Sequence, residues 1–178
     1  MDFSLIPMDC IEIESQSSSK YSIKLMGQDG PLTFKMSNVH LPYGITRNKK
    51  GKAVVPIRFE DETRYHKNKQ FFEKLDQHIA KRFESSKYLT MLSLDVIHPL
   101  VSTNSKGQSN MILKDKYDER VTAMDLPYNC TADVTLQVPF IWYLKASQTK
   151  DMKQDITGAF FVIKEINNFF SKGSNNLF

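Results

Sequence analysis

The chain has 178 residues, of which 40% are hydrophobic and 25% are charged, and its formal net charge is +4. This composition is typical of a globular domain and excludes a disordered, collagen-like or coiled-coil protein. No apolar run approaches the ~20 residues that a membrane-spanning helix needs, and the first residues lack the basic and apolar regions of a secretory signal. We therefore expect one intracellular domain over residues 1–170, a flexible tail over 171–178 and no membrane partner.

The first part of the chain is predicted to form strands. Apolar and polar residues alternate over 20–28 and again over 32–37, which is the pattern of half-buried strands. The glycine-containing turn at 27–31 predicts that these two strands form a hairpin. Alternation over 55–59 predicts a third strand, in which Pro56 indicates a sheet edge or a bulge.

One helix is predicted over about 66–85, followed by more strands. The apolar residues of the helix recur at helical spacing and are Phe72, Leu75, Ile79 and Phe83. Strands are expected at 88–97, 111–113, 133–145 and 155–166. A helix between the third and fourth strands predicts a mainly β (α+β) fold, an OB-fold-like barrel of about five to six strands. A β-sandwich with one connecting helix would have the same order of elements.

Strand parity divides the aromatic residues near the C-terminus into two faces. One face, predicted to be core, holds Val138, Phe140, Trp142 and Leu144. The other face, predicted to be surface, holds Ile141, Tyr143 and Lys145. Phe160 and Phe161 point to opposite faces of the last strand, so that strand is apolar on both sides. Such a strand is buried on both faces, which is compatible with a contact in a homo-oligomer.

Basic residues are concentrated in one segment. Residues 47–69 contain eight Lys or Arg against three acidic residues, a net charge of +5 that exceeds the charge of the whole chain. Such a concentration is the electrostatic footprint of a protein that binds a polyanion. The residues predicted to contact phosphates are Arg47, Lys49, Lys50, Lys52, Arg58 and Lys145. A solvated loop is the alternative interpretation of these lysines.

Aromatic residues lie close to these cations. Tyr43, Tyr65 and Tyr143 are predicted to stack on bases, because proteins that bind single strands combine a basic groove with aromatic platforms. The phosphate and stacking contacts expected here suit DNA and RNA equally well.

No catalytic motif is present. The sequence has no phosphate-binding glycine loop, no nucleophile elbow and no HExxH metal motif. The four histidines are scattered, and Cys10 and Cys130 are too far apart in sequence for a metal-binding motif. We therefore predict a protein without catalytic residues, cofactor or metal site.

The order of several short blocks resembles that of a known family. The blocks are Leu41–Ile45, Val54–Phe59, Phe71–Ile79, Val138–Trp142 and Gly158–Ile166. Over about residues 38–166 the chain resembles the OB-fold single-stranded-DNA-binding proteins of nucleocytoplasmic large DNA viruses, the African swine fever virus type. The resemblance implies non-catalytic coating of single-stranded DNA during viral replication, repair or recombination, in the host cytoplasm or nucleus.

Three functions are thus considered. The leading one is a largely sequence-independent single-stranded DNA-binding protein, with RNA as a second ligand. The alternative is a β-sandwich structural or assembly protein, capsid-like or a scaffold, that self-associates through its Phe-rich C-terminal region. The third is a small hydrolase or nuclease whose acids meet only in the folded state.

Overall fold

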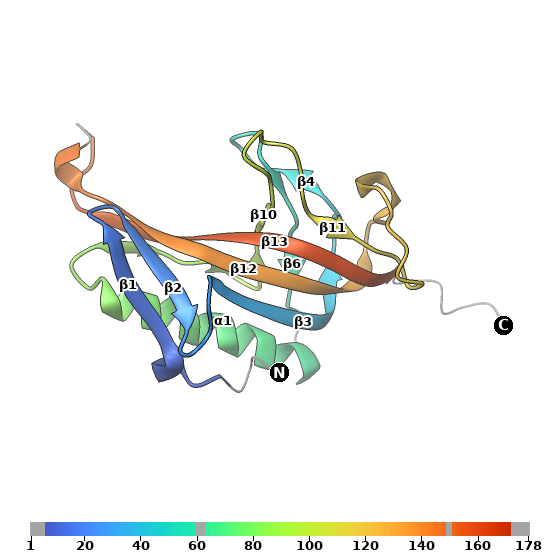
Figure 1. Cartoon of the computed structure of the whole chain (residues 1–178), viewed down its shortest axis with the longest axis horizontal. Coiled ribbons are helices and arrows are strands. Elements are labelled where there is room, and N and C mark those ends of the chain that lie inside the picture. Colours follow the sequence, from blue (N-terminus) through green and yellow to red (C-terminus); the bar gives the residue numbers. More distant parts are fainter. Residues whose placement is uncertain (1–5, 60–62, 149–150, 172–178) are drawn as a thin grey trace.

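The computed structural model describes residues 6–59, 63–148 and 151–171, which are mainly β with a single α-helix. The strands form one curled, open sheet, a half-barrel, and the helix lies beneath it (Figure 1). The predicted mainly β class is therefore confirmed. Of the predicted tail only Ser171 is described, as the last residue of a strand. No helix in the described part of the chain is long and apolar enough to cross a membrane.

A long hairpin forms the centre of the sheet. It consists of β12 (Cys130–Leu144) and β13 (Ile156–Ser171), which pair antiparallel along nearly their whole length. Both strands are rich in Val, Ile, Thr and aromatic residues, which suit a pleated, half-buried surface. The strands predicted at 133–145 and 155–166 are confirmed, and each is a few residues longer than expected.

Two strands follow one another along the outer edge of β12. β3 (Leu32–Leu41) pairs with the first part of β12, and β2 (Lys20–Leu25) pairs with Ile141 and Trp142 further along. β1 (Ile11–Ser17) forms a hairpin with β2. The predicted hairpin between 20–28 and 32–37 is wrong. Both strands run antiparallel to β12, so they point in the same direction and the turn between them joins them end to end.

Short strands cover the other edge of β13. β7 (Lys87–Leu89), β10 (Leu100–Val101) and β11 (Ile112–Leu113) pair with it in parallel at three successive stretches. β5 (Ala53–Val54) pairs with β10, and β4 (Thr46–Arg47) pairs with β5. The basic loop predicted from the sequence therefore closes a hairpin beside the central strands.

The remaining strands extend from β3. β6 (Ile57–Arg58) pairs with β3, β9 (Val96–Ile97) pairs with β6, and β8 (Leu92–Ser93) pairs with β9. The single strand predicted at 88–97 is wrong, because this segment is divided among β7, β8 and β9. Leu94 has a φ of 56°, a left-handed conformation that turns the chain between β8 and β9.

The helix α1 (Thr63–Arg82) is confirmed, with both ends three residues earlier than predicted. Its side chains Phe72, Leu75 and Ile79 are fully buried. Phe72 packs against Phe34 of β3 and against Phe59, the residue after β6, with ring centroids 5.6 and 5.7 Å away. Burial of this apolar face, more than helix propensity, holds α1 on the sheet. The short 3-10 turns are Met8–Cys10, Ala123–Asp125 and Ala146–Gln148.

Candidate nucleic-acid interface

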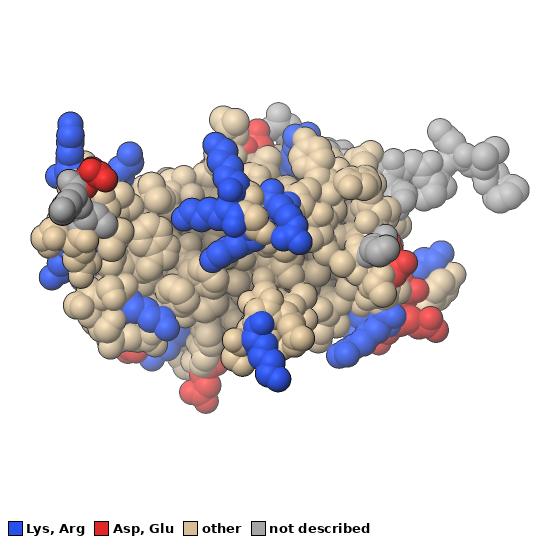
Figure 2. All heavy atoms as spheres, turned by 90° about the horizontal axis from the view of Figure 1, so that it is seen from above, with Lys and Arg blue, Asp and Glu red and all other residues tan. Residues whose placement is uncertain are grey.

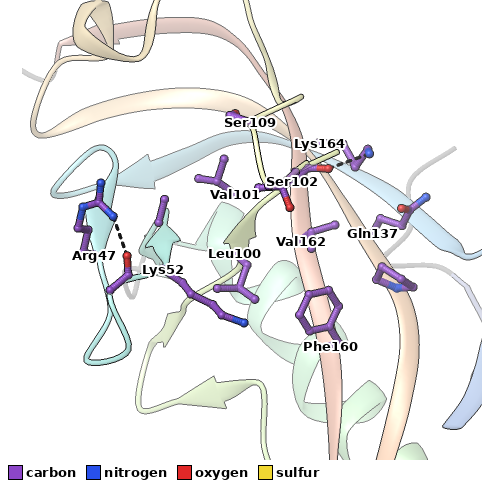
Figure 3. A pocket seen from close by; sticks show the side chains of 15 residues that line it. Arg47, Lys52, Leu100, Val101, Ser102, Ser109, Gln137, Phe160, Val162 and Lys164 are labelled. Atoms are coloured by element: carbon purple, nitrogen blue, oxygen red, sulfur yellow. Dashed lines mark hydrogen bonds between the residues drawn. The ribbon is translucent and has the colours of Figure 1, made fainter. Parts of the chain in front are cut away.

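A groove of about 650 Å³ lies between the β4–β5 hairpin, β10 and the β12–β13 hairpin (Figure 3). β4 and β10 lie on the side of the β12–β13 hairpin opposite α1 (Figure 1). The β4–β5 hairpin forms one wall, β10 and the loop after it form another, and the outer face of β12 and β13 forms the floor. Fifteen described residues line it: Arg47, Gly51, Lys52, Ala53, Leu100, Val101, Ser102, Thr103, Gly107, Ser109, Gln137, Pro139, Phe160, Val162 and Lys164.

The groove is basic. Arg47, Lys52 and Lys164 line it, and no acidic residue is among its described lining residues. Figure 2, which looks onto this face, shows Lys and Arg side chains gathered over its middle. The Lys164 ammonium donates a hydrogen bond to the buried Ser102 hydroxyl at 2.9 Å, and Arg47 donates to the Gly51 carbonyl at 2.7 Å (Figure 3). These bonds leave each cation with further donors for an anion.

An asparagine organises the basic loop. The Asn48 side-chain oxygen accepts the backbone N–H groups of Lys50 and Lys52, both at 3.0 Å. Gly51 completes the turn with a φ of 74°, which costs glycine little. The exposed lysines therefore project from a hydrogen-bonded turn.

The same turn recurs across the groove. The Asn104 side-chain oxygen accepts the N–H groups of Lys106 and Gln108, and Gly107 has a φ of 75°. In a third turn of this kind, the Asp115 side-chain oxygen accepts the N–H groups of Tyr117 and Glu119. The spacing of Asn with Gly three positions later, at 48–51 and at 104–107, is visible in the sequence and would have identified the hairpin at 104–108. The turn at Asp115 has Asp118, with a φ of 65°, in place of the glycine.

A bulge in β12 reverses the face assignment predicted from strand parity. The pairing with β13 shifts between Gln137 and Phe140, around Pro139. Val138 is fully buried as predicted, but beyond the bulge Ile141 is fully buried instead of exposed. Phe140, Trp142 and Leu144, predicted to be core, are only half-buried. One extra residue in a strand moves every later side chain to the opposite face, so the face prediction for 140–144 is wrong. Lys145, just beyond β12, is exposed as predicted.

The reversal creates an aromatic row on the outer face of the hairpin. Phe140 and Phe160 are cross-strand partners whose rings stack at 4.9 Å with an angle of 8° between their planes. The Lys20 ammonium lies over Phe140, 4.6 Å from the ring centroid. Two strand residues further along, Trp142 pairs with Gly158. Sequence reasoning missed Lys20, Phe160 and Lys164 as site residues. Phe160, Val162 and Lys164 occupy every second position of β13, and this spacing was the available signal that they share one face.

Gly158 leaves room for the Trp142 indole. A Cβ atom at Gly158 would lie 2.5 Å from the indole Cζ2 atom. Gly158→Ala should therefore displace the indole, shift the emission of this single tryptophan and lower the free energy of unfolding by ~1–2 kcal/mol. Emission spectra and urea unfolding would measure both effects. Gly27→Ala, where an added Cβ meets nothing within 4 Å, should leave the emission unchanged, and an unchanged spectrum for Gly158→Ala would contradict the proposed packing.

The predicted phosphate contacts are only partly brought together. Arg47 and Lys52 line the groove, and Lys49 and Lys50 are exposed on the turn beside it. Arg58 lies elsewhere, half-exposed on β6 between β3 and β9.

Of the predicted stacking tyrosines, Tyr43 and Tyr143 do not line the groove. Tyr43 is 51% exposed in the turn that follows β3. Tyr65 lies in the first turn of α1, with its side chain outside the described residues.

Tyr143 and Lys145 line a separate hollow of about 360 Å³ beside the end of α1. The Tyr143 ring packs against Phe83, and its hydroxyl donates to Asp155. Asp155 also accepts the Ala146 N–H at 2.8 Å, and the hydrogen bond from Tyr143 is the main cause that lowers the pKa of Asp155. Tyr143 therefore fastens the end of the β12–β13 hairpin and is not presented to the groove.

Metal-binding groups do not converge in the described part of the chain. No cluster of three or more His, Cys, Asp or Glu side chains suited to a metal ion occurs there. Cys10 and Cys130 are free thiols, and burial raises the pKa of Cys130 to about 11. A thiol with so high a pKa is an unreactive core residue at neutral pH.

Comparison with known proteins adds no family assignment. No protein-family model matches the chain, and no curated protein matches its sequence.

Proposed function

We propose that this chain is a non-catalytic protein that binds single-stranded nucleic acid, and DNA first of all, with little sequence preference. One observation carries the proposal: three cations and no described acidic residue line a groove whose floor includes an aromatic ring. Lys and Arg neutralise phosphates whatever the sequence, and aromatic rings accept any base. The groove therefore offers both kinds of contact that a single strand requires.

The composition of the groove favours a single strand over a duplex. Val162 and Phe160 on the floor and Leu100 on the β10 wall supply an apolar surface between the cations. A duplex presents phosphates to a protein but keeps its base faces stacked inside, whereas a single strand exposes both. An apolar floor gains nothing from a phosphate, so we expect the bases of an unpaired strand to be its ligand.

We also propose that the half-barrel is a variant OB-fold. Val54 pairs with Leu100, the Val55 N–H donates to the Pro99 carbonyl at 3.1 Å, and Ile57 pairs with Ile97. Followed through these contacts, segments 53–58 and 96–101 act as two continuous barrel strands. Together with β3, β12 and β13 they count as five strands of a partly open barrel, the number in an OB-fold. In this count the helix follows the second strand, whereas the predicted layout places it after the third.

The resemblance to the single-stranded-DNA-binding proteins of large DNA viruses supports the same function. It would place the chain in viral DNA replication, repair or recombination, inside the host cell. Coating of single strands needs no catalytic group, in line with the absence of known catalytic motifs from the sequence.

Fluorescence anisotropy tests the proposal directly. A labelled single strand of about 30 nucleotides, long enough for ~4–16 nucleotides per OB-fold, is titrated at low and high salt beside its duplex and an RNA strand of the same sequence. We expect tight, salt-sensitive binding to the DNA single strand and much weaker binding to the duplex. Absence of binding at low salt, or equal binding to the duplex, would overturn the proposal. Tighter binding to the RNA strand would overturn its preference for DNA.

A further inference from the structure

The outer face of the β12–β13 hairpin holds a ready-made stack of rings. Phe160 lines the groove, whereas Phe140, stacked on it at 4.9 Å, does not. One face of the Phe160 ring is therefore occupied by Phe140, and the groove meets the remainder of the ring. Figure 3 shows Phe160 at the end of the groove, next to Leu100 and Val162.

We propose that Phe160 is the base-stacking platform of this groove, with a nucleobase as the next ring after Phe140 and Phe160. The inference rests on the proposed function and specifies how the ligand is held. Bases lie on Phe160 and on the apolar floor, and the phosphates on either side of a stacked base reach Lys52 on one wall and Lys164 further along β13.

The stack is ordered before any ligand arrives. Lys20 from β2 covers the Phe140 ring, with its ammonium 4.6 Å from the centroid. The register of the hairpin holds Phe140 opposite Phe160, with a separation and tilt suited to ring stacking. A platform fixed by neighbouring strands loses little conformational freedom on binding, so most of the stacking energy is retained as affinity.

The position of Trp142 makes the platform observable. Trp142 follows Phe140 on the same face of β12, and it is the only tryptophan of the chain. A base that stacks on Phe160 lies near this indole, so binding of a strand with bases should quench or shift its emission. A strand without bases should change the emission much less.

The experiment compares two ligands and three proteins. The ligands are a dT strand of about 30 nucleotides and an abasic strand of the same length, which keeps the phosphates but has no bases. The proteins are the wild type, Phe160→Leu and the matched control Phe170→Leu, in which an exposed ring at the far end of the same strand is replaced. Affinity, its salt dependence and the Trp142 emission are measured for each pair, and urea unfolding verifies that each variant is folded.

We expect Phe160→Leu to weaken binding of the dT strand by about five- to tenfold and to leave binding of the abasic strand and the salt slope unchanged. Phe170→Leu should bind both strands as the wild type does. An equal loss for both strands, or no loss for either, would overturn the stacking role while leaving the proposed function intact. A wild type that binds neither strand would overturn the proposed function itself. If Phe160→Leu unfolds, Phe160→Tyr takes its place. It keeps a ring and should retain the wild-type preference for the dT strand, and loss of that preference would overturn the stacking role.

Discussion

Replacement of Arg47, Lys52 and Lys164 together by alanine should lower the affinity for single-stranded DNA by about two orders of magnitude at moderate salt. These three cations line one groove that has no described acidic residue to compensate for their loss. Each phosphate contact on a single strand contributes ~0.7 to the slope of log affinity against log salt, so the slope should become shallower by about 2. Anisotropy titrations over a series of salt concentrations measure both quantities.

A variant with the same change in charge separates the groove from the general field of the protein. Lys74 and Lys81 on α1 and Lys87 on β7 are exposed and absent from the lining of the groove. Their joint replacement by alanine should weaken binding only several-fold through long-range attraction. If the two triple variants show equal losses of affinity and equal changes in the slope of log affinity against log salt, the groove is not the binding site.

Lysines on the exposed turn and lysines that line the groove should differ in the same assay. Lys49 and Lys50 are exposed on the turn and do not line the groove. The joint loss of Lys49 and Lys50 should therefore cost less affinity than the loss of Lys52 and Lys164, although the number of charges removed is equal.

The helix could be predicted from the sequence because its signal is local. Phe72, Leu75 and Ile79 repeat at the helical period, and the residues that this pattern selects are the ones buried against the sheet. The strands at 133–145 and 155–166 were found for the same reason, since alternation depends only on neighbouring residues.

Strand partners could not be predicted, because pairing is not a local property. The sequence around 27–31 has the composition of a hairpin turn, but β2 and β3 both pair with β12, whose partner residues lie 89 to 122 positions away in the chain. The competition between a local hairpin and a long central strand is decided by burial over the whole sheet. The alternation of residues within one segment therefore does not identify the strand with which it pairs.

The basic part of the site could be predicted from the sequence, but its aromatic part could not, mainly because of the bulge at Pro139. The basic loop was recognised because its charges are contiguous. Strand parity without a bulge at Pro139 places Phe140 and Trp142 in the core, whereas the bulge turns them to the outer face. Proline lacks the N–H that a sheet ladder needs, so its position within a long strand was the available signal for a change of face.

Asp76→Ala should destabilise the fold by ~3 kcal/mol, the largest effect expected from a single substitution outside the apolar core. The Asp76 side chain is 6% exposed and accepts three hydrogen bonds, from the Tyr88 hydroxyl at 2.7 Å and from the N–H groups of Met91 and Leu92 at 3.0 and 3.1 Å. It therefore ties α1 to the segment that joins β7 and β8. Alanine would leave three donors without an acceptor, and urea unfolding should show a lower midpoint with an unchanged m-value.

The asparagine variant distinguishes the loss of acceptors from the loss of charge. Burial raises the pKa of Asp76, and the three hydrogen bonds act in the opposite direction. Because the folded-state pKa is raised, ionisation of Asp76 costs the folded state stability as the pH rises from about 4 through that pKa. Asp76→Asn retains an acceptor and avoids this cost, so it should remain within ~1 kcal/mol of the wild type at pH 7. Any advantage of the wild type over Asp76→Asn should shrink between pH 4 and pH 7. If Asp76→Asn is as unstable as Asp76→Ala, or if the difference from the wild type grows with pH, the carboxylate itself is required at this position.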